Sequence, residues 1–234
     1  MNNDRKPKPI VSSDAPITVV GGAKVTRADL STALKFAPTV VAADGGANDL
    51  GRCGIKPVAV IGDLDSLTED ARELYHDRLH LIEEQDSVDF DKALRHVSAP
   101  VVVAVGVTGG RLDHQLAVLN VLVRHADRPC ILLGEGSVTC LCPPEVSLPV
   151  AAGTIVSLFP MAAVGVASVG LEWPTDGLAF SPDGRIGTSN TATGPIRLVP
   201  DAPAMLLILP DDQLGVLIEA LSLRGAPTWP APAG

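Results

Sequence analysis

Short apolar runs that end in acidic or glycine-rich segments recur through the first half of this chain. Thr39–Ala43 is followed by Asp-Gly-Gly, Val58–Ile61 by Gly-Asp-Leu-Asp, and Val101–Val105 by Gly-Val-Thr-Gly-Gly. A buried parallel strand reads as such a continuous apolar run, and open α/β sheets bind their ligands just beyond the carboxyl ends of the strands. The pattern therefore predicts a sheet that gathers polar, ligand-facing residues at one edge.

Helical patterns separate these runs up to about residue 135. Thr26–Asp29 has the spacing of a partial capping box, and Ser66–Tyr75 begins with a serine and early acids, as a helix N-terminus prefers. Asp89–Val97 and Leu112–His125 complete the set, the latter with Leu112, Leu116, Leu119 and Val123 on one face. Because strands and helices alternate, we expect an α/β fold with a doubly wound, mostly parallel sheet. The expected strands are Ile17–Val20, Thr39–Ala43, Val58–Ile61, His80–Ile82, Val101–Val105 and Cys130–Leu133.

The pattern changes near Pro143-Pro144. Short apolar runs separated by Pro, Gly, Asp and Asn, without a helical period, predict a small all-β sandwich domain, followed by a helix over Asp211–Leu223. We therefore expect an α/β catalytic domain over 15–142 and a β-sandwich domain over 143–225, with flexible tails at 1–14 and 226–234. The expected sandwich strands are Thr154–Phe159, Val164–Val169, Gly177–Phe180, Ile196–Val199 and Ala204–Leu209.

Composition excludes several classes of function. The net charge of −9 and the pI near 4.9 disfavour a nucleic-acid partner, which would need a basic surface. No run approaches the roughly 20 apolar residues that cross a bilayer. The four cysteines lie in or beside apolar runs and form no C-x-x-C pair, so we expect reduced thiols. These features predict a cytoplasmic protein without a membrane partner.

The acids that follow the strands indicate a metal site. Asp63 and Asp65 are two residues apart, so their side chains point the same way if this segment is still extended. Together with Asp44 and Asp89 they form a group of carboxylates without matching bases, which suits Mg²⁺ holding a phosphate chain. The alternative, an acidic turn that caps a helix from Ser66, explains Asp65 but not a second acid.

Two glycine-rich turns are candidates for phosphate binding. Asp44–Asn48 contains Gly45 and Gly46, and Thr108–His114 contains Gly109, Gly110 and Arg111. Bare backbone N–H groups at a helix N-terminus cradle phosphate, and the planar guanidinium of arginine suits its oxygens. Each turn taken alone is also compatible with an ordinary strand-to-helix connection, and His114 with a simple helix-terminal hydrogen bond. The chain has no P-loop and no G-x-G-x-x-G motif, which disfavours P-loop kinases and dinucleotide-binding dehydrogenases.

These motifs, taken in order, resemble those of the thiamine pyrophosphokinase family. The resemblance covers about residues 16–209 and includes a second-domain segment with Trp173 and Ser189-Asn190. Val88 departs from the pattern, because the family usually has Thr inside its Asp-x-Thr-Asp motif. The matching motifs are Asp-Gly-Gly-Ala-Asn at 44–48, Gly-Asp-Leu-Asp-Ser at 62–66, Gln-Asp-Ser-Val-Asp-Phe-Asp-Lys at 85–92 and Thr-Gly-Gly-Arg-Leu-Asp-His at 108–114.

The resemblance implies transfer of a pyrophosphoryl group from ATP to the hydroxyl of thiamine, with release of AMP and with Mg²⁺ as cofactor. It implies that Asp63, Asp65 and Asp89 hold the metal and that Asp113 orients the hydroxyl or accepts its proton. It also implies a homodimer with composite active sites, in which Trp173 stacks on thiamine and Ser189 and Asn190 contact the aminopyrimidine. The residues implied for the nucleotide and its phosphates are Asp44, Gly45, Gly46, Asn48, Lys92, Thr108, Gly109, Gly110 and Arg111.

Two other functions fit parts of the pattern. An archaeal-type 6-hydroxymethylpterin diphosphokinase would share the acidic and Gly-Gly motifs but would not require Trp173 or Ser189-Asn190. A magnesium-nucleotide sensor would bind without transferring, and would have little use for Lys92, Arg111 and Asp113 together. An assay with MgATP and thiamine that distinguishes AMP from ADP separates these possibilities.

Overall fold

The computed structural model describes residues 8–84 and 86–231, and its contacts divide the chain into two compact units. The division falls after Leu119, inside helix α5 (Leu112–Arg124), whereas the expected domain boundary lies at 142/143. The domain limits stay a prediction. In the described part of the chain, no helix is both long enough and apolar enough to cross a membrane.

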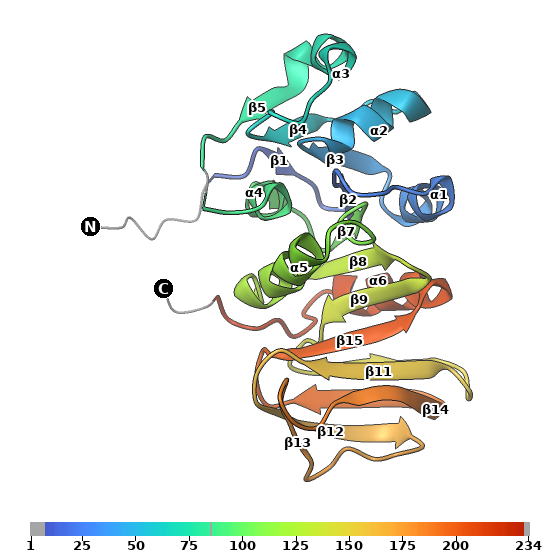
Figure 1. Cartoon of the computed structure of the whole chain (residues 1–234). Helices are drawn as coiled ribbons and strands as arrows, with labels where there is room; N and C mark the ends of the chain where they lie inside the picture. Colours follow the sequence, from blue (N-terminus) through green and yellow to red (C-terminus); the bar gives the residue numbers. More distant parts are fainter. Residues whose placement is uncertain (1–7, 85, 232–234) are drawn as a thin grey trace. The chain divides into compact units, whose positions relative to one another are not determined.

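The first unit is built on a parallel sheet with strand order β7-β2-β3-β4-β5. Helices α1 (Arg27–Phe36) and α2 (Gly46–Cys53) lie on one side of this sheet and α4 (Asp89–Arg95) on the other (Figure 1). The expected α/β fold is confirmed. Its strands are β2 (Ile17–Val20), β3 (Thr39–Ala43), β4 (Ala59–Gly62), β5 (Leu79–Leu81) and β7 (Val102–Val105).

The direction of winding changes at β2. The chain moves outward from β2 through β3 and β4 to β5, and then returns to place β7 on the opposite side of β2. Ligands of open α/β sheets bind at such a switch point, at the carboxyl ends of the strands. Gly21 and Gly106 follow these two strands and pack closely, because a Cβ on Gly21 would lie 2.6 Å from the carbonyl oxygen of Gly106.

Helix boundaries in the first unit follow the capping chemistry. Thr26 caps α1 as expected, since its Oγ1 accepts a hydrogen bond from the N–H of Asp29 at 3.0 Å. Helix α3 (Glu69–Leu74) does not begin at Ser66, because Thr68 Oγ1 accepts from the N–H of Ala71 and supplies its N-cap. Helix α4 begins after Val88, whose side chain makes no cap hydrogen bond at the position where the resemblance leads one to expect Thr.

Helix α5 presents a different face from the one expected. Leu112 and Leu116 are 69% and 56% exposed, while Val118, Val121 and Leu122 are buried. The expected stripe fails in its first half only, because Leu119 and Val123 are half-buried while Leu112 and Leu116 are exposed.

In the second unit the described strands pair antiparallel, in the order β13-β12-β14-β11-β15-β9-β8, with β10 (Val146–Leu148) also pairing with β14. Helix α6 (Leu214–Ser222) follows a short 3-10 turn, and the two-layer sandwich stays a prediction. The strands are β8 (Cys130–Gly134), β9 (Ser137–Leu141), β11 (Ile155–Pro160), β12 (Val164–Leu171), β13 (Ala179–Phe180), β14 (Gly187–Pro200) and β15 (Met205–Pro210).

Parts of both expected tails make defined contacts. Strand β1 (Val11–Ser12) pairs parallel with β6 (Val97–Ser98), and Trp229 Nε1 donates a hydrogen bond to the carbonyl oxygen of Cys142 at 2.9 Å. Residues 1–7 and 232–234 lie outside the described residues. The flexibility of the two tails stays a prediction.

Candidate active site

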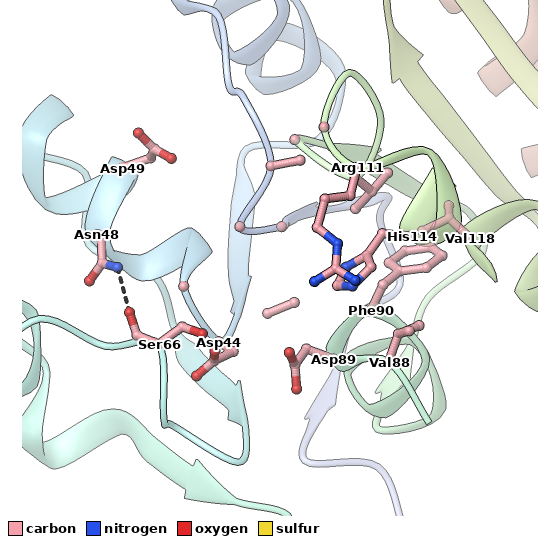
Figure 2. A pocket seen from close by; sticks show the side chains of 18 of the residues that line it. Asp44, Asn48, Asp49, Ser66, Val88, Asp89, Phe90, Arg111, His114 and Val118 are labelled. Atoms are coloured by element: carbon pink, nitrogen blue, oxygen red, sulfur yellow. Dashed lines mark hydrogen bonds between the residues drawn. The ribbon is translucent and has the colours of Figure 1, made fainter. Parts of the chain in front are cut away.

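A cavity of about 530 Å³ opens at the switch point of the first unit. Its floor is formed by the segments that follow β2, β3 and β7, and its walls by α4 and the start of α5 (Figure 2). Asp44 and Asp89 lie at one side of the cavity, and the side chains of Arg111 and His114 project into it from another. Two carboxylates and a guanidinium from three separate segments therefore face one space.

Asp44 is the most buried acid that lines this cavity. It is 2% exposed, and its backbone has a φ of 41°, a left-handed conformation that is uncommon outside glycine. Burial raises the pKa of Asp44, and the nearby carboxylates of Asp89 and Asp63 add to this effect, while a hydrogen bond with Ser66 opposes it. Within residues 8–84 and 86–231, Oδ1 of Asp44 has no hydrogen-bond partner. A buried, charged oxygen in this state is costly unless a ligand satisfies it.

Asp63 and Asp65 approach Asp44 through a tight turn. One carboxylate oxygen from each of the three residues lies within 4.8 Å of the other two. The expected extended geometry is wrong, because β4 ends at Gly62 and Leu64 has a φ of 65°. The left-handed residue reverses the chain, so that the N–H of Asp65 points back to Oδ1 of Asp63 at 3.4 Å. The two acids converge by this turn rather than by strand alternation.

Lys92 compensates part of this negative charge through ion pairs with two of the carboxylates. It is 1% exposed, and its Nζ donates to Oδ2 of Asp63 at 2.7 Å and to Oδ1 of Asp89 at 3.1 Å. Burial alone would lower the pKa of Lys92, but its hydrogen bonds to the two carboxylates outweigh this effect and raise the pKa. The hydrogen bond from Lys92 lowers the pKa of Asp63. Asp63 therefore stays ionised beside the cavity.

Asn48 joins two of the motifs. Its Nδ2 donates to the carbonyl oxygen of Ser66 at 2.8 Å, and its Oδ1 accepts from both the N–H and the hydroxyl of Thr68 (Figure 2 shows the first of these bonds). Asn48 also lines the cavity. It thereby ties the loop that carries Asp65 to helix α2, which fixes one carboxylate relative to the Gly45-Gly46 turn.

The second glycine turn directs backbone donors at one acceptor. When the amide of Gln115 is oriented to satisfy both of its ends, its oxygen accepts from the N–H groups of Gly109 at 2.6 Å and Gly110 at 3.2 Å. Two adjacent N–H groups that converge on one oxygen form the kind of concave donor set that binds phosphate oxygens. Arg111 follows directly and forms an exposed ion pair with Asp113, which lowers the pKa of Asp113.

The structure brings most of the expected first-unit residues to this cavity. Six of them line it, namely Asp44, Gly45, Asn48, Asp89, Gly110 and Arg111. Asp63, Asp65 and Lys92 stand behind Asp44 and Asp89 through the contacts above. Gly46, Thr108, Gly109 and Asp113 belong to the segments that surround the cavity but are not among the lining residues.

Several lining residues were not expected from the sequence. Gly21 and Gly22 follow β2, and this third Gly-Gly pair after an apolar run repeats the signal of the other two turns. Phe90 and Gln115 also line the cavity, and their sequence context gives no signal of a functional role. Each of the three segments that form the floor of the site therefore carries a Gly-Gly pair after an apolar run, and this signal is visible in the sequence.

The remaining expected residues lie in the second unit. Trp173 is 58% exposed, whereas Asn190 is buried at 6% exposure and forms hydrogen bonds to Trp173. Ser189 has a φ of 61°, and its N–H donates to Oγ of Ser157 at 3.0 Å. A large exposed aromatic beside a constrained turn is typical of a binding surface.

The first unit is an α/β domain with an acidic cluster and glycine-rich turns at the switch point of its sheet. A model described as the thiamin pyrophosphokinase catalytic domain matches residues 30–132. Thiamine pyrophosphokinase 1 of Oryza sativa subsp. japonica is 28% identical over an alignment of 198 positions, which covers 67% of this chain and 75% of the relative. The crystal structure of thiamin pyrophosphokinase from Geobacillus thermodenitrificans aligns with a TM-score of 0.69 at 25% identity, covering 85% of this chain and 99% of that one. Together, these sequence and structure comparisons indicate the thiamine pyrophosphokinase family.

Proposed function

We propose that this chain transfers the pyrophosphoryl group of MgATP to the hydroxyl of thiamine, giving thiamine diphosphate and AMP. The observation that carries the proposal is the buried, unpartnered oxygen of Asp44 beside two further carboxylates, at the edge of a cavity with converging backbone donors. Family membership supplies the substrates, since the matched relatives are thiamine pyrophosphokinases. Neither the pterin kinase nor the nucleotide sensor is favoured by these relatives.

The carboxylates fit a magnesium ion. Magnesium prefers oxygen ligands and uses one or two carboxylates together with substrate phosphates and water. Asp44, Asp63 and Asp65 offer oxygens within one coordination shell, and Asp89 lies beside them through Lys92. The sequence resemblance assigns the metal to Asp63, Asp65 and Asp89, and we add Asp44 to this set because of its unpartnered oxygen. When bound, Mg²⁺ neutralises charge on the phosphate oxygens.

The other residues at the site hold and orient the triphosphate. The N–H groups of the Gly45-Gly46 turn bind phosphate oxygens, and those of Gly109 and Gly110 do so when a phosphate oxygen displaces the Gln115 oxygen that accepts from them. Arg111 adds a bidentate donor. Lys92 keeps Asp63 ionised and in place. In the reaction, the thiamine oxygen forms a bond to the β-phosphorus, the bond from that phosphorus to the oxygen of AMP breaks, and the hydroxyl proton leaves to a base. We assign that proton to Asp113, which has to part from Arg111 to accept it because this ion pair lowers its pKa.

The second unit supplies the thiamine site in this proposal. The exposed ring of Trp173 stacks on thiamine, and Ser189 contacts its aminopyrimidine. A homodimer completes each site with Trp173 of the neighbouring subunit. Large apolar side chains left exposed on one chain, such as Val169 at 63% and Trp173 at 58%, support a partner surface. The cytoplasmic location and the lack of a nucleic-acid partner stay predictions.

The products of the reaction test the proposed activity. Purified protein incubated with MgATP and thiamine should release AMP and thiamine diphosphate in equal amounts, as quantified by chromatography. Stoichiometric ADP and thiamine monophosphate would contradict the proposal, because they report attack on the γ-phosphorus. Turnover of 6-hydroxymethylpterin but not of thiamine would favour the pterin kinase, and nucleotide binding without any product would favour the sensor.

Removal of the Trp173 ring should weaken thiamine binding selectively. Stacking and cation–π contacts are worth about 1–2 kcal/mol when desolvated, so Trp173→Ala should raise the KM for thiamine about tenfold. The KM for ATP should stay near that of the wild type, since the phosphate cavity is built from the first unit. An unchanged thiamine KM in Trp173→Ala would remove the ring from the substrate site.

Mixed dimers test whether the site is shared. Asp63→Asn protomers are nearly inactive, and Trp173→Ala protomers are slow when thiamine is kept below their raised KM. At such a thiamine concentration the mixture should regain activity, because a heterodimer then has one site with both residues intact. If verified heterodimers recover no activity, the site is not shared between subunits. The stacking role of Trp173 is then still tested by the thiamine KM of Trp173→Ala.

A further inference from the structure

The side chain of Asn190 forms hydrogen bonds with the backbone of Trp173. Its Oδ1 accepts from the N–H of Trp173 at 3.2 Å, and its Nδ2 donates to the carbonyl oxygen of Trp173 at 2.7 Å. Oδ1 also accepts from the N–H of Thr191 at 2.8 Å. The amide is buried at 6% exposure, whereas Trp173 is 58% exposed. A buried amide with three hydrogen bonds to its own chain is held tightly, because breaking any of them would leave a buried polar group unsatisfied.

These bonds extend the strand pairing by one residue. Strand β12 pairs with β14 as far as Leu171 opposite Ala192, and the N–H of Glu172 donates to the carbonyl oxygen of Thr191 at 2.8 Å. At Trp173 the partner changes from the backbone of β14 to the amide of Asn190. The backbone turns away here, because Ser189 is left-handed and donates its N–H to Ser157 instead. The side-chain amide of Asn190 thus replaces the missing peptide group of the ladder.

This replacement fixes the backbone of Trp173. Both backbone polar groups of Trp173 are bound by one side chain, and Pro174 restricts the residue before it to extended conformations. The ring itself stays exposed, so its position depends on the backbone that carries it.

We propose that Asn190 is a positioning residue, which holds the Trp173 ring in the orientation that thiamine requires. The inference rests on the proposed function for the use of that ring, but the coupling of Asn190 to Trp173 is a property of the chain alone. It differs from the expected direct contact of Asn190 with the aminopyrimidine, because the effect of Asn190 on thiamine then passes through Trp173.

A double-mutant cycle distinguishes the two roles. Asn190→Ala should raise the KM for thiamine about tenfold with little change in kcat or in the KM for ATP, because two hydrogen bonds to Trp173 are lost. In the Trp173→Ala background the same change should add less than about twofold, since interacting residues are not additive. Full additivity of the two changes would overturn the proposal and leave a direct contact with substrate.

Fluorescence gives a second readout that needs no substrate. The chain has two tryptophans, so Trp229→Phe leaves Trp173 as the single reporter. In this background, Asn190→Ala should lower the steady-state anisotropy of Trp173 and increase its quenching by acrylamide. Unchanged anisotropy and quenching would overturn the positioning role. Fluorescence does not depend on turnover, so it tests the positioning role of Asn190 even if the wild type does not convert thiamine. An inactive wild type would contradict only the proposed function.

Two further variants show whether the effects of Asn190→Ala come only from a general loss of stability. Thr18→Val removes a comparable buried hydrogen bond, from Thr18 Oγ1 to the carbonyl oxygen of Ala37 in the first unit, and should leave the Trp173 fluorescence unchanged. If Asn190→Ala does not fold, Asn190→Asp is measured in its place. It keeps an oxygen acceptor but removes the donor to Trp173, so it should shift anisotropy and quenching in the same direction; wild-type values for a folded Asn190→Asp would overturn the proposal.

Discussion

Asp63→Asn should lower kcat by about a thousandfold or more while leaving the protein folded, the scale expected when preorganised electrostatic stabilisation is lost. The substitution keeps an oxygen that accepts the hydrogen bond from Lys92, but it removes one charge from the carboxylates that face the cavity. Stability should change little, because relief of repulsion from Asp44 and Asp65 offsets the weaker contact with Lys92. Steady-state kinetics over a range of Mg²⁺ concentrations, with thermal unfolding alongside, measure both effects.

Variants of other acids test whether the loss of activity is specific to the carboxylates at the cavity. Asp65→Asn and Asp89→Asn should also lose most activity, whereas Asp70→Asn, an exposed acid in the first turn of α3, should keep it. Near-normal turnover of all three site variants at saturating Mg²⁺ would show that the metal site lies elsewhere.

Lys92→Met should produce the largest loss of stability among these variants. Lys92 is 1% exposed, and its removal leaves the carboxylates of Asp63 and Asp89 without their shared partner beside Asp44. Removing one member of such a buried charge cluster costs about 3 kcal/mol, and in a chain of this length each kcal/mol lowers the melting temperature by about 3 °C. Lys35→Met, in an exposed position of α1, is the matched control and should unfold near the wild-type temperature.

The stability difference between Lys92→Met and the wild type should depend on pH. In the wild type the lowered pKa of Asp63 contributes stability at neutral pH, which is lost as the pH falls through that pKa. Without Lys92 the same acids repel one another, so their pKa values rise and acidification relieves the repulsion. The difference in stability between Lys92→Met and the wild type should therefore shrink as the pH falls from 7 toward about 4, near the ordinary pKa of a carboxyl group. A difference that stays constant over this range would show that packing of the lysine stem, not its charge, stabilises the site.

The sequence predicts the first unit well because its signals are local. Apolar runs set β2 and β3 at their observed bounds, and the glycine and aspartate motifs lie at the strand ends, where parallel topology brings them together. The convergence of Asp44, Asp63 and Asp89 follows from this topology alone. Which acid is most buried does not, because burial depends on how the turn at Leu64 folds back against β3.

The second unit was less predictable. Strand β14 runs from Gly187 to Pro200, but only its apolar part, Ile196–Val199, has a recognisable strand pattern. Its polar first half is strand because it pairs with β11 and β12, and this depends on partners far along the chain. The hydrogen bonds of Asn190 to Trp173 span 17 residues, so no local pattern could separate a residue that binds substrate from one that positions another.

Three glycines beneath the phosphate cavity complicate any genetic survey of this protein. A Cβ on Gly46 would lie 2.0 Å from the carbonyl oxygen of Val20, and one on Gly62 would lie 2.7 Å from Cβ of Asp44, so both positions, like Gly21, exclude even alanine. None of the three has a side chain that could react or bind. A screen that scores only growth or turnover would nonetheless rank them with the carboxylates of the proposed metal site. Gly46 and Gly62 lie within two residues of Asp44 and Asp63 in the sequence, and Gly21 packs against the turn that follows β7. Abundance measured in parallel with activity would separate loss through displaced backbone from loss of chemistry.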